Sequence, residues 1–566
     1  DVLDISDPAN PALVFTIDLS PYGDGVNSVA IRKGVVAVAV ESDPKTDPGK
    51  VVFFNRQGQY VSDVTVGALP DMLIFTPDAK FLLVANEGEP NDDYTIDPMG
   101  TVSVISLGTD PAKKVKNIKQ KHVTTVDFTG FNGASLDPGI RIFGPGVSVA
   151  QDMEPEYIAI SDDSRIAYVV CQENNAIAEI NIRKRQINSL WGLGFKDHSL
   201  PGNGLDASND DDSIRIDNWP VKGLYMPDAI AFYSKGGKDY IFTANEGDSR
   251  EYEGTPGYVG EERIKDLTLD PTAFPNAADL QKNENLGRLK VAISEGDIDN
   301  DGDYDELYSY GARSFSIYDV NGTQVYDSGD DFEQITAIEY PDDFNSGNDE
   351  NDSFDSRSDD KGPEPEGLTL GQIGNRTYAF IGLERMGGIM VYDVTIPTSP
   401  SFITYYNNRD FSADAESDTV GDLGPEGILF IPAWNSPNGE PLLVVTNEVS
   451  GTTTIYQIDE DPVRKAFVDG DILSGVRLMA NAPNPFTEQT EIRFSLEEAA
   501  DVKIEVYTLM GHKVSTLTDR PYKPGEHSIN WQATDDQGAR LSAGVYITRM
   551  VSGNTVIIKK MIYLGE

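Results

Sequence analysis

The chain repeats one pattern of short apolar runs, and this repeat constrains the fold more than any other feature. Clear copies are FLLVANEGEP at 81–90, YIFTANEGD at 240–248 and YAFIGLERMGG at 378–388. Each run has the length of a strand, is rich in Val, Ile and aromatic residues, and is bounded by turn residues, which is typical of antiparallel strands. Regular recurrence of such units predicts a propeller or another repeat architecture.

Seven units can be counted, which is a common number of propeller blades. They begin near residues 26, 69, 153, 226, 306, 361 and 423. The fifth unit, 306–319, differs because Arg313 stands where the others carry Glu. The segment DISDPANP (4–11) has the spacing of DVTIPTSP (393–400), so the first residues resemble the end of a blade. We therefore expect residues 12–19 to add the outer strand of the last blade and to close the ring.

The pattern changes after residue 458. Residues 459–475 are predicted to be a linker, and residues 476–566 show alternating strands with turns about every ten positions, which favours a small Ig-like β-sandwich. The predicted fold is therefore all-β, with a seven-bladed β-propeller over 1–458 and the sandwich over 476–566. Long acidic insertions between the units, such as 196–225 and 250–286, are predicted to be loops without a core of their own.

Charge and composition exclude several classes of function. Asp and Glu total 93 against 45 Lys and Arg, a net charge of −48, and such a surface repels nucleic acid and anionic lipid. Most of this charge is typical of a solvated extracellular surface. No apolar run is long enough to span a membrane. The single cysteine, Cys171, rules out an internal disulfide and lies in the apolar run AYVVC, which predicts a buried thiol. The start at Asp1, without an initiator Met, suggests a processed N-terminus.

Acidic residues recur at two points of each unit, the start of its first strand and the end of its second. Because these strands run in opposite directions, both points lie on one face near the channel of a propeller. Like charges this close raise each other's pKa unless cations neutralise them, and oxygen ligands without His or Cys select Ca²⁺ or Mg²⁺. The alternative is that each carboxylate caps backbone amides at a blade turn. The expected ring consists of Glu41, Asp71, Glu87, Glu154, Glu156, Glu173, Asp228, Glu246, Glu364, Glu366, Glu384, Glu426 and Glu448.

The stretch DIDNDGDYDE at 297–306 is the sharpest motif in the chain. Its alternating acids can converge on one cation, and Gly302 permits the tight turn, as in the first half of an EF-hand loop. Tyr308 stands where an EF-hand carries its last Glu, so Glu306 or a distant acid must complete the shell. The alternative is a solvated acidic turn. The predicted calcium ligands are Asp297, Asp299, Asp301, Asp303, Asp305 and Glu306.

Four arginines lie among these acids, namely Arg250, Arg313, Arg357 and Arg385. Arg binds phosphate or carboxylate through two parallel hydrogen bonds, so Arg beside bound cations would form a pocket for an anionic ligand such as a phosphate ester. The alternative is that each Arg is simply paired with neighbouring acids. No GxSxG motif and no phosphate-binding Gly loop occurs in the sequence.

An ordered set of motifs occurs near the C-terminus, namely Pro483-Asn484-Pro485-Phe486, Tyr507, Gly511, Trp531, Gly544-Val545-Tyr546 and Lys559-Lys560-Met561. With these motifs, the C-terminal residues resemble the type A sorting domain of type IX secretion substrates in Bacteroidetes-like bacteria. The resemblance implies export across the outer membrane by the type IX machinery through residues 476–566, followed by surface attachment or release.

Four segments of the repeat region form a specific set: NEGEP (86–90), NEGDSREY (245–252), GDIDNDGDYDEL with GARSFSIYD (296–319), and RSDDKGPEPEG with GLERMGGIMVYD (357–393). In these segments the repeat region resembles the choice-of-anchor I family of secreted bacterial propeller proteins, which are often described loosely as alkaline phosphatases or cell-surface glycoproteins. The resemblance covers nearly all of 1–458 and implies a secreted or cell-surface location more than a reaction.

Two functions follow from these observations, and the sequence leaves open whether the protein is an enzyme. In the first, it is a surface binding or structural protein that uses calcium for rigidity and its loops for contact with glycans, partners or copies of itself. In the second, it is a calcium-dependent phosphohydrolase. A lactonase-like or other small-molecule enzyme is a third alternative. The candidate catalytic residues are Glu364, Glu366, Glu384, Arg313 and Arg385.

Overall fold

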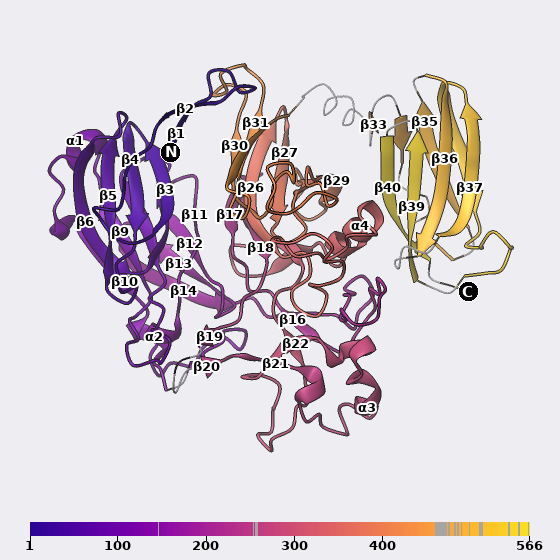
Figure 1. Ribbon diagram of the computed structural model, residues 1–566, viewed down its shortest axis with the longest axis horizontal. Coiled ribbons are helices and arrows are strands. Elements are labelled where there is room, and N and C mark those ends of the chain that lie inside the picture. The colour runs from indigo at the N-terminus through magenta and orange to yellow at the C-terminus, as the bar shows by residue number, and fades with distance from the viewer. Residues whose placement is uncertain are drawn as a thin grey trace.

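The computed structural model of this chain is all-β, with only short helices (Figure 1). The residues that it describes are 1–144, 146–252, 254, 258–458, 472–473, 476–479, 481, 483, 486–487, 489–496, 498–508, 513–541, 544–552, 555–563 and 565. Within them, no helix is long and apolar enough to cross a membrane.

Six antiparallel sheets follow one another along the repeat region, and we number them sheet 1 to sheet 6. Within each sheet, every strand pairs with the next strand of that sheet in chain order. The strands are, for sheet 1, β3 (Val26–Arg32), β4 (Val35–Val40), β5 (Pro48–Asn55) and β6 (Tyr60–Ala68); for sheet 2, β7 (Pro70–Phe75), β8 (Phe81–Asn86), β9 (Thr101–Ser106) and β10 (Val123–Asp127); for sheet 3, β11 (Ile158–Ile160), β12 (Ile166–Cys171), β13 (Ala176–Asn181) and β14 (Gln186–Gly192); for sheet 4, β17 (Ile230–Lys235), β18 (Lys238–Asn245), β24 (Ser314–Asp319) and β25 (Gln324–Asp327); for sheet 5, β26 (Pro365–Ile373), β27 (Arg376–Leu383), β28 (Ile389–Asp393) and β29 (Ser401–Tyr406); and for sheet 6, β30 (Pro425–Ile431), β31 (Leu442–Asn447) and β32 (Thr452–Gln457).

Each sheet packs face to face on the next one along the chain. A cluster of buried apolar side chains lies between every successive pair of sheets, as with Phe53 of sheet 1 and Val84 of sheet 2. Burial of these side chains supplies the main driving force for the stacking. Figure 1 shows the resulting succession, from the indigo strands of sheet 1 to the orange strands of sheet 6.

The count of seven units is wrong at the fifth. The stretch 306–319 was predicted to be a separate blade, but its strand β24 pairs with β18 and is the third strand of sheet 4. This pairing could not be predicted, because a long insertion separates β18 from β24 in the sequence. The pattern of apolar residues predicts that a segment is a strand, but it does not predict with which strand it pairs.

The N-terminal hairpin, β1 (Val2–Asp4) and β2 (Ala12–Phe15), repeats the outer half of sheet 5. Asp4 faces Ala12 as Asp393 faces Ser401, and both pairings carry a bulge between the two residues that precede the Asp. The expectation that β2 would join the last sheet is wrong, because within the described residues β2 pairs with β1 alone. In the view of Figure 1 the hairpin lies between β3 and β30.

The insertions before sheet 4 and between its strands β18 and β24 fold into small elements with a core of their own, contrary to the prediction of coreless loops. Trp219, Phe274 and Leu286 belong to this core. Its sheets pair β15 (Phe195–Asp197) with β16 (Lys222–Leu224) and β23 (Tyr308–Ser309), β19 (Glu251–Tyr252) with β20 (Tyr258–Val259), and β21 (Glu261–Arg263) with β22 (Lys290–Ala292). Within the described residues, the α-helices are α1 (Pro111–Val115), α2 (Val149–Asp152), α3 (Ala277–Leu280) and α4 (Asp331–Glu339), and other helical turns lie at Gln120–His122, Thr129–Phe131, Ile264–Asp266 and Asn283–Gly287.

The C-terminal region is a sandwich of two antiparallel sheets around one apolar core, as predicted. Phe486, Phe494 and Trp531 are buried in that core. Most of the predicted linker 459–475 lies outside the described residues, but Ile472–Leu473 forms β33 and already belongs to the sandwich. One sheet contains β33, β34 (Val476–Leu478), β35 (Thr490–Leu496) and β38 (Gly525–Trp531), and the other contains β37 (Lys513–Tyr522), β36 (Ala500–Thr508), β39 (Gly544–Ser552) and β40 (Thr555–Tyr563).

Candidate functional site

The acidic positions named from the sequence lie at the strand ends where the first and second strands of a sheet meet. Pro70 at the start of β7 pairs with Asn86 at the end of β8, which places Asp71 and Glu87 together. The same end-to-end pairing joins β26 to β27 and β30 to β31. The backbone amide of Glu87 donates to the carbonyl of Leu69 at 2.9 Å and so fixes this corner.

A three-residue motif lies at or just before the start of the first strand in five sheets. It consists of any residue, then Pro, then Asp or Glu. The residue before the proline has a positive φ at Leu69 (44°), Met226 (41°) and Glu364 (51°). Residues other than glycine rarely adopt this conformation, and strain of this kind gathers at functional sites. We did not identify this motif from the sequence, although its recurrence was visible there. Its copies are at 69–71, 154–156, 226–228, 364–366 and 424–426.

Carboxylates from different sheets act on one another at the centre of the repeat region. Burial, and after it the charge of Glu426, raises the pKa of Asp71 to about 7. Burial and then the charges of Glu246 and Asp71 raise the pKa of Asp228. The pKa of Glu366 is raised by burial and then by Glu246 and Asp228. The structure therefore brings acids of sheets 2, 4, 5 and 6 close to one another.

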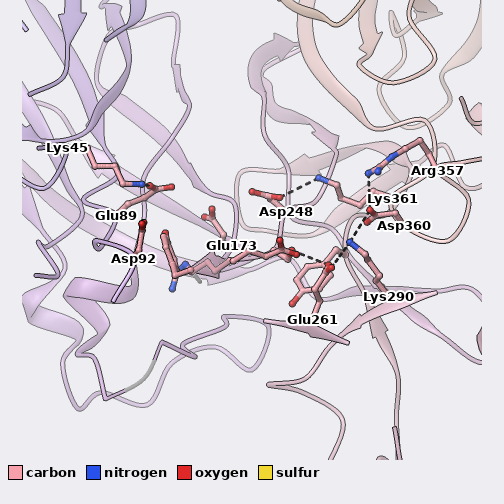
Figure 2. Close-up of a pocket in the computed structure, with 15 residues that line it drawn as sticks. Lys45, Glu89, Asp92, Glu173, Asp248, Glu261, Lys290, Arg357, Asp360 and Lys361 are labelled. Atoms are coloured by element: carbon pink, nitrogen blue, oxygen red, sulfur yellow. Dashed lines mark hydrogen bonds and ion pairs between the residues drawn. The ribbon is translucent and has the colours of Figure 1, made fainter. Parts of the chain in front are cut away.

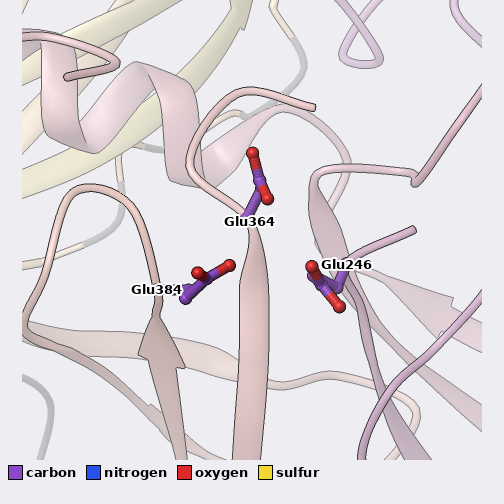
Figure 3. Close-up of side chains that lie close together, drawn as sticks. All are labelled: Glu246, Glu364 and Glu384. Carbon is purple, nitrogen blue, oxygen red and sulfur yellow. The ribbon is translucent and has the colours of Figure 1, made fainter. Parts of the chain in front are cut away.

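One close group of acids joins sheets 4 and 5 (Figure 3). Glu246 follows β18, Glu364 precedes β26 and Glu384 follows β27, and one oxygen of each lies within 4.8 Å of the others. All three side chains are buried. Three unpaired charges in such a place would be strongly unfavourable, so neutralising groups are required.

Three cations of the chain neutralise this group, and we call the six residues the charge network. Lys361 Nζ lies 3.2 Å from Glu246 Oε1 and 3.3 Å from Glu364 Oε2. Arg357 Nη2 lies 2.7 Å from Glu364 Oε1, and Arg385 Nε lies 3.0 Å from Glu364 Oε2. The Lys361 ammonium thus bridges Glu246 and Glu364. The role of Lys361 was not predicted, although it lies next to the GPEPEG segment.

The charge network divides its acids into one ionised and one protonated group. Although burial opposes ionisation, the charges of Lys361, Arg357 and Arg385 lower the pKa of Glu364 to about 2. Burial and then the charge of Glu364 raise the pKa of Glu384 to about 9. Glu384 is therefore protonated at neutral pH, where Glu364 carries the negative charge.

A cavity of about 410 Å³ opens beside the charge network (Figure 2). Side chains of both signs line it, together with the rings of Tyr252 and Tyr310. In Figure 2, Lys361 reaches toward Asp248 and Lys290 toward Glu261, at 3.4 Å and 2.5 Å respectively. A cavity with paired charges and aromatic rings suits a polar ligand rather than an apolar one.

A second buried group of acids belongs to sheet 3 and to α2 before it. Arg250 Nη1 donates to Asp152 Oδ1 at 2.7 Å, and Arg250 Nε donates to Glu154 Oε2 at 2.9 Å. Glu156 and Glu173 are also buried but have no ion pair within the described residues. Arg250 therefore pairs with neighbouring acids, as the alternative interpretation of the arginines proposed.

Three ring positions and Arg313 lie outside the two buried groups. Glu426 and Glu448 are exposed, although the charge of Glu426 acts on Asp71 and Asp228, and Glu41 is half-exposed at the end of β4. Arg313 is buried, is paired with Glu333 at 2.5 Å, and also donates to the carbonyls of 206, 358 and 360. Its guanidinium holds loops together and is not directed at a ligand, because four short contacts already engage it.

The acidic loop at 297–306 brings three of its predicted ligands together. One oxygen of each of Asp297, Asp299 and Asp305 lies within 4.8 Å of the others. The backbone amides of Asp301 and Gly302 donate to Asp297, each at 3.1 Å, which fixes its carboxylate.

The other predicted ligands of this loop lie elsewhere. Asp303 and Asp305 form a second group with Asp270, which was not predicted because it is distant in sequence. The prediction is wrong for Glu306, whose carboxylate pairs with Lys222 at 2.5 Å and accepts a hydrogen bond from Tyr308. The spacing of acids along the sequence predicted that Glu306 would bind the same cation as the loop. Its carboxylate instead pairs with Lys222, which is distant in the sequence.

Comparison with known proteins identifies the family of the repeat region. The choice-of-anchor I domain model matches residues 1–397. The chain belongs to this family. The FlgD Ig-like domain model matches residues 481–555, in agreement with the sandwich.

Two relatives and one solved structure are similar to this choice-of-anchor I protein. "Gigasin-3a" of Magallana gigas is 35% identical over 190 residues, 32% of this chain and 66% of the relative. "Mesenchyme-specific cell surface glycoprotein" of Strongylocentrotus purpuratus is 28% identical over 317 residues, 50% of this chain and 38% of the relative. The chain thus spans less than two thirds of either relative. A solved structure from Lactobacillus plantarum is 12% identical and covers 77% of this chain and 82% of its own, with a TM-score of 0.39.

Proposed function

We propose that this protein is a secreted or cell-surface binding protein built on a β-propeller. Family membership and the name of the sea-urchin relative, a cell surface glycoprotein, support the location. Six sheets stacked in order support the propeller, and the β1–β2 hairpin supports a seventh blade position because it has the register of an outer blade half.

The charge network is the observation that favours binding over catalysis. Its cations Lys361, Arg357 and Arg385 are held by Glu246, Glu364 and Glu384, so they do not present free charges to a phosphoryl group. A hydrolase of the phosphate class needs cations that can contact the transferred group. The network instead gives the adjoining cavity a rigid wall of fixed polarity.

The cavity beside the network is the binding site of this proposal. Its tyrosines can stack on a sugar ring, and its paired acids and lysines can hydrogen-bond hydroxyl groups. We therefore propose a glycan or another polyhydroxylated ligand on a partner surface. The phosphohydrolase remains the second candidate, because the same cavity is also lined by Lys45 and Lys290, which lie outside the charge network.

A glycan array and a phosphatase assay separate the two candidates. We expect the wild-type protein to bind glycans in calcium, and the cavity variant Asp248→Asn/Lys290→Gln to lose binding, while the exposed control Glu440→Gln retains it. Turnover of p-nitrophenyl phosphate in calcium that disappears in Glu384→Gln, with unchanged melting temperature, would instead establish the hydrolase.

We further propose that the loop 297–305 binds Ca²⁺ in a structural role. Asp297, Asp299 and Asp305 supply hard oxygen ligands. The hydrogen bonds that two backbone amides donate to the Asp297 carboxylate have the arrangement of an EF-hand turn. Calcium should raise the melting temperature of the wild-type chain and should slow amide exchange in this loop. Asp297→Asn/Asp299→Asn should abolish both effects, and equal responses in the two proteins would remove the loop from the proposal.

The C-terminal sandwich is proposed to act as a type IX sorting domain. The Ig-like match and the buried Trp531 support a sandwich of the required kind. Asn484, Pro485 and Gly511 of the sorting motifs lie outside the described residues. Fusing residues 472–566 to a periplasmic reporter in a host with this machinery should place the reporter at the cell surface, and retention in the periplasm would contradict the assignment.

A further inference from the structure

Sheet 3 buries a pair of carboxylates without the built-in cations of the charge network. Glu156 precedes β11 and Glu173 follows β12, and their exposed fractions are 7% and 6%. The backbone amide of Glu156 donates to the carbonyl of Val170 at 3.0 Å, which holds the two strand ends together. Glu156 Oε2 and Glu173 Oε2 have no hydrogen-bond donor within the described residues.

The charge of Arg250 acts on Glu173, but its guanidinium forms ion pairs with other acids. All three nitrogens of the Arg250 guanidinium donate to Asp152 or Glu154, at 2.7 to 2.9 Å. Even so, Glu154 Oε1 is buried and also has no donor. Sheet 3 therefore holds more buried carboxylate oxygens than its own donors can satisfy.

Such a pair needs either a proton or a cation, because two buried charges that repel each other are costly. The carboxyl groups of Glu156 and Glu173 lie within hydrogen-bonding reach, so a shared proton could satisfy one contact. A shared proton would not supply donors to all of the unpartnered oxygens. A divalent cation could contact several of them at once.

An entry path for a cation exists. Glu173 lies on the wall of the 410 Å³ cavity, in the open part of Figure 2 between Glu89 and Asp248. Water from this cavity can complete the coordination shell of an ion that binds there. Ligands that consist of carboxylate and water select hard cations such as Ca²⁺ or Mn²⁺.

We propose that Glu156 and Glu173 form a site for a hard divalent cation, with water from the cavity as its remaining ligands. This site is separate from the acidic loop 297–305 and from the charge network, where Lys361 supplies the positive charge. It does not depend on the proposed glycan-binding function. The bound ion would neutralise sheet 3 as the lysine and arginines neutralise sheets 4 and 5.

Manganese titration of the full chain, followed by electron paramagnetic resonance of the free ion, tests this site. The loop variant Asp297→Asn/Asp305→Asn serves as the starting protein, because Asp305 belongs to both acid groups of the loop and its loss disables both. It should still bind Mn²⁺. Adding Glu156→Gln/Glu173→Gln should weaken that binding at least tenfold, an effect on the order of those that follow loss of metal-site groups. The buried control Glu505→Gln in the sandwich should leave it unchanged.

Thermal unfolding gives a second readout that does not require binding to be measured directly. In EDTA the Glu156→Gln/Glu173→Gln protein should melt at the same or a higher temperature, because like charges are removed. Only the protein with both glutamates should gain stability from Mn²⁺. If the double variant does not fold, each single variant should still weaken binding. Absence of Mn²⁺ binding by the loop variant, or equal binding in the Gln variants, would show a shared proton and overturn the proposal.

Discussion

Replacing Glu364 with Gln should destabilise the protein by about 3 kcal/mol at pH 7. The carboxylate is fully buried and its pKa falls from 4.5 to about 2 in the folded chain. A shift of about 2.5 units at 1.36 kcal/mol per unit is about 3.4 kcal/mol. Part of this loss should be recovered, because removing Glu364 lowers the pKa of Glu384 and lets it ionise beside the same cations.

The pH dependence follows from the sign of this shift. The folded state keeps Glu364 ionised at a lower pH than the unfolded state does, so the stabilisation is complete above about pH 5. It is lost as the pH falls from about 4.5 toward 2. At pH 3.5 the difference between the wild-type protein and Glu364→Gln should therefore narrow to about 2 kcal/mol.

Urea unfolding in EDTA at pH 7 and at pH 3.5, followed by circular dichroism, measures both quantities. Glu440→Gln is the matched control, because Glu440 is exposed and the change should stay within about 0.5 kcal/mol. Equal midpoints for Glu364→Gln and the wild-type protein at pH 7 would refute the reasoning. A difference that does not narrow at pH 3.5 would show that the loss arises from packing and not from charge.

Three further predictions concern other parts of the chain. Gly311→Ala should destabilise the protein by at least about 2 kcal/mol in urea unfolding, because Gly311 has a φ of +70° and a Cβ there would lie 1.9 Å from the carbonyl oxygen of Glu246. Cys171 should react with a thiol reagent only after unfolding, since burial raises the pKa of its thiol, and rapid labelling of the native chain would contradict this. Trp531→Ala should cost about 3–5 kcal/mol in calorimetry, but only in the transition of the sandwich, because the side chain is buried in that core alone.

Local sequence patterns predicted the strands and the ends at which acids gather. Both follow from short-range rules, namely the length of apolar runs and the reversal of direction between neighbouring strands. The pairing of β24 with β18 does not follow from them, because a long insertion separates the two strands. The core that contains Trp219 and Phe274 was missed for a similar reason, since scattered apolar residues in an acidic stretch show no period.

The acidic loop shows how distant contacts override local spacing. Asp297, Asp299 and Asp305 converge as their alternation predicted. Glu306 has equally suitable chemistry, yet Lys222 binds it, and Asp270 approaches the loop from the insertion instead. The spacing of side chains along one strand or turn can predict candidate metal ligands. Which of these candidates lie close enough to bind one ion depends on the fold.

The same reasoning explains why a ring of like residues is not one site. The repeat places acids at equivalent corners of every sheet, which the sequence shows, but the cations that meet them come from non-equivalent loops. Lys361 and Arg357 come from the long segment before β26 and Arg385 from the turn after β27, so the acids of sheets 4 and 5 are satisfied within the chain. No such segment supplies Glu156 and Glu173 with a cation among the described residues. The strands of this chain repeat, but the loops between them do not. An acid at the equivalent strand end of a sheet is therefore available to an external cation only where the neighbouring loop brings no lysine or arginine.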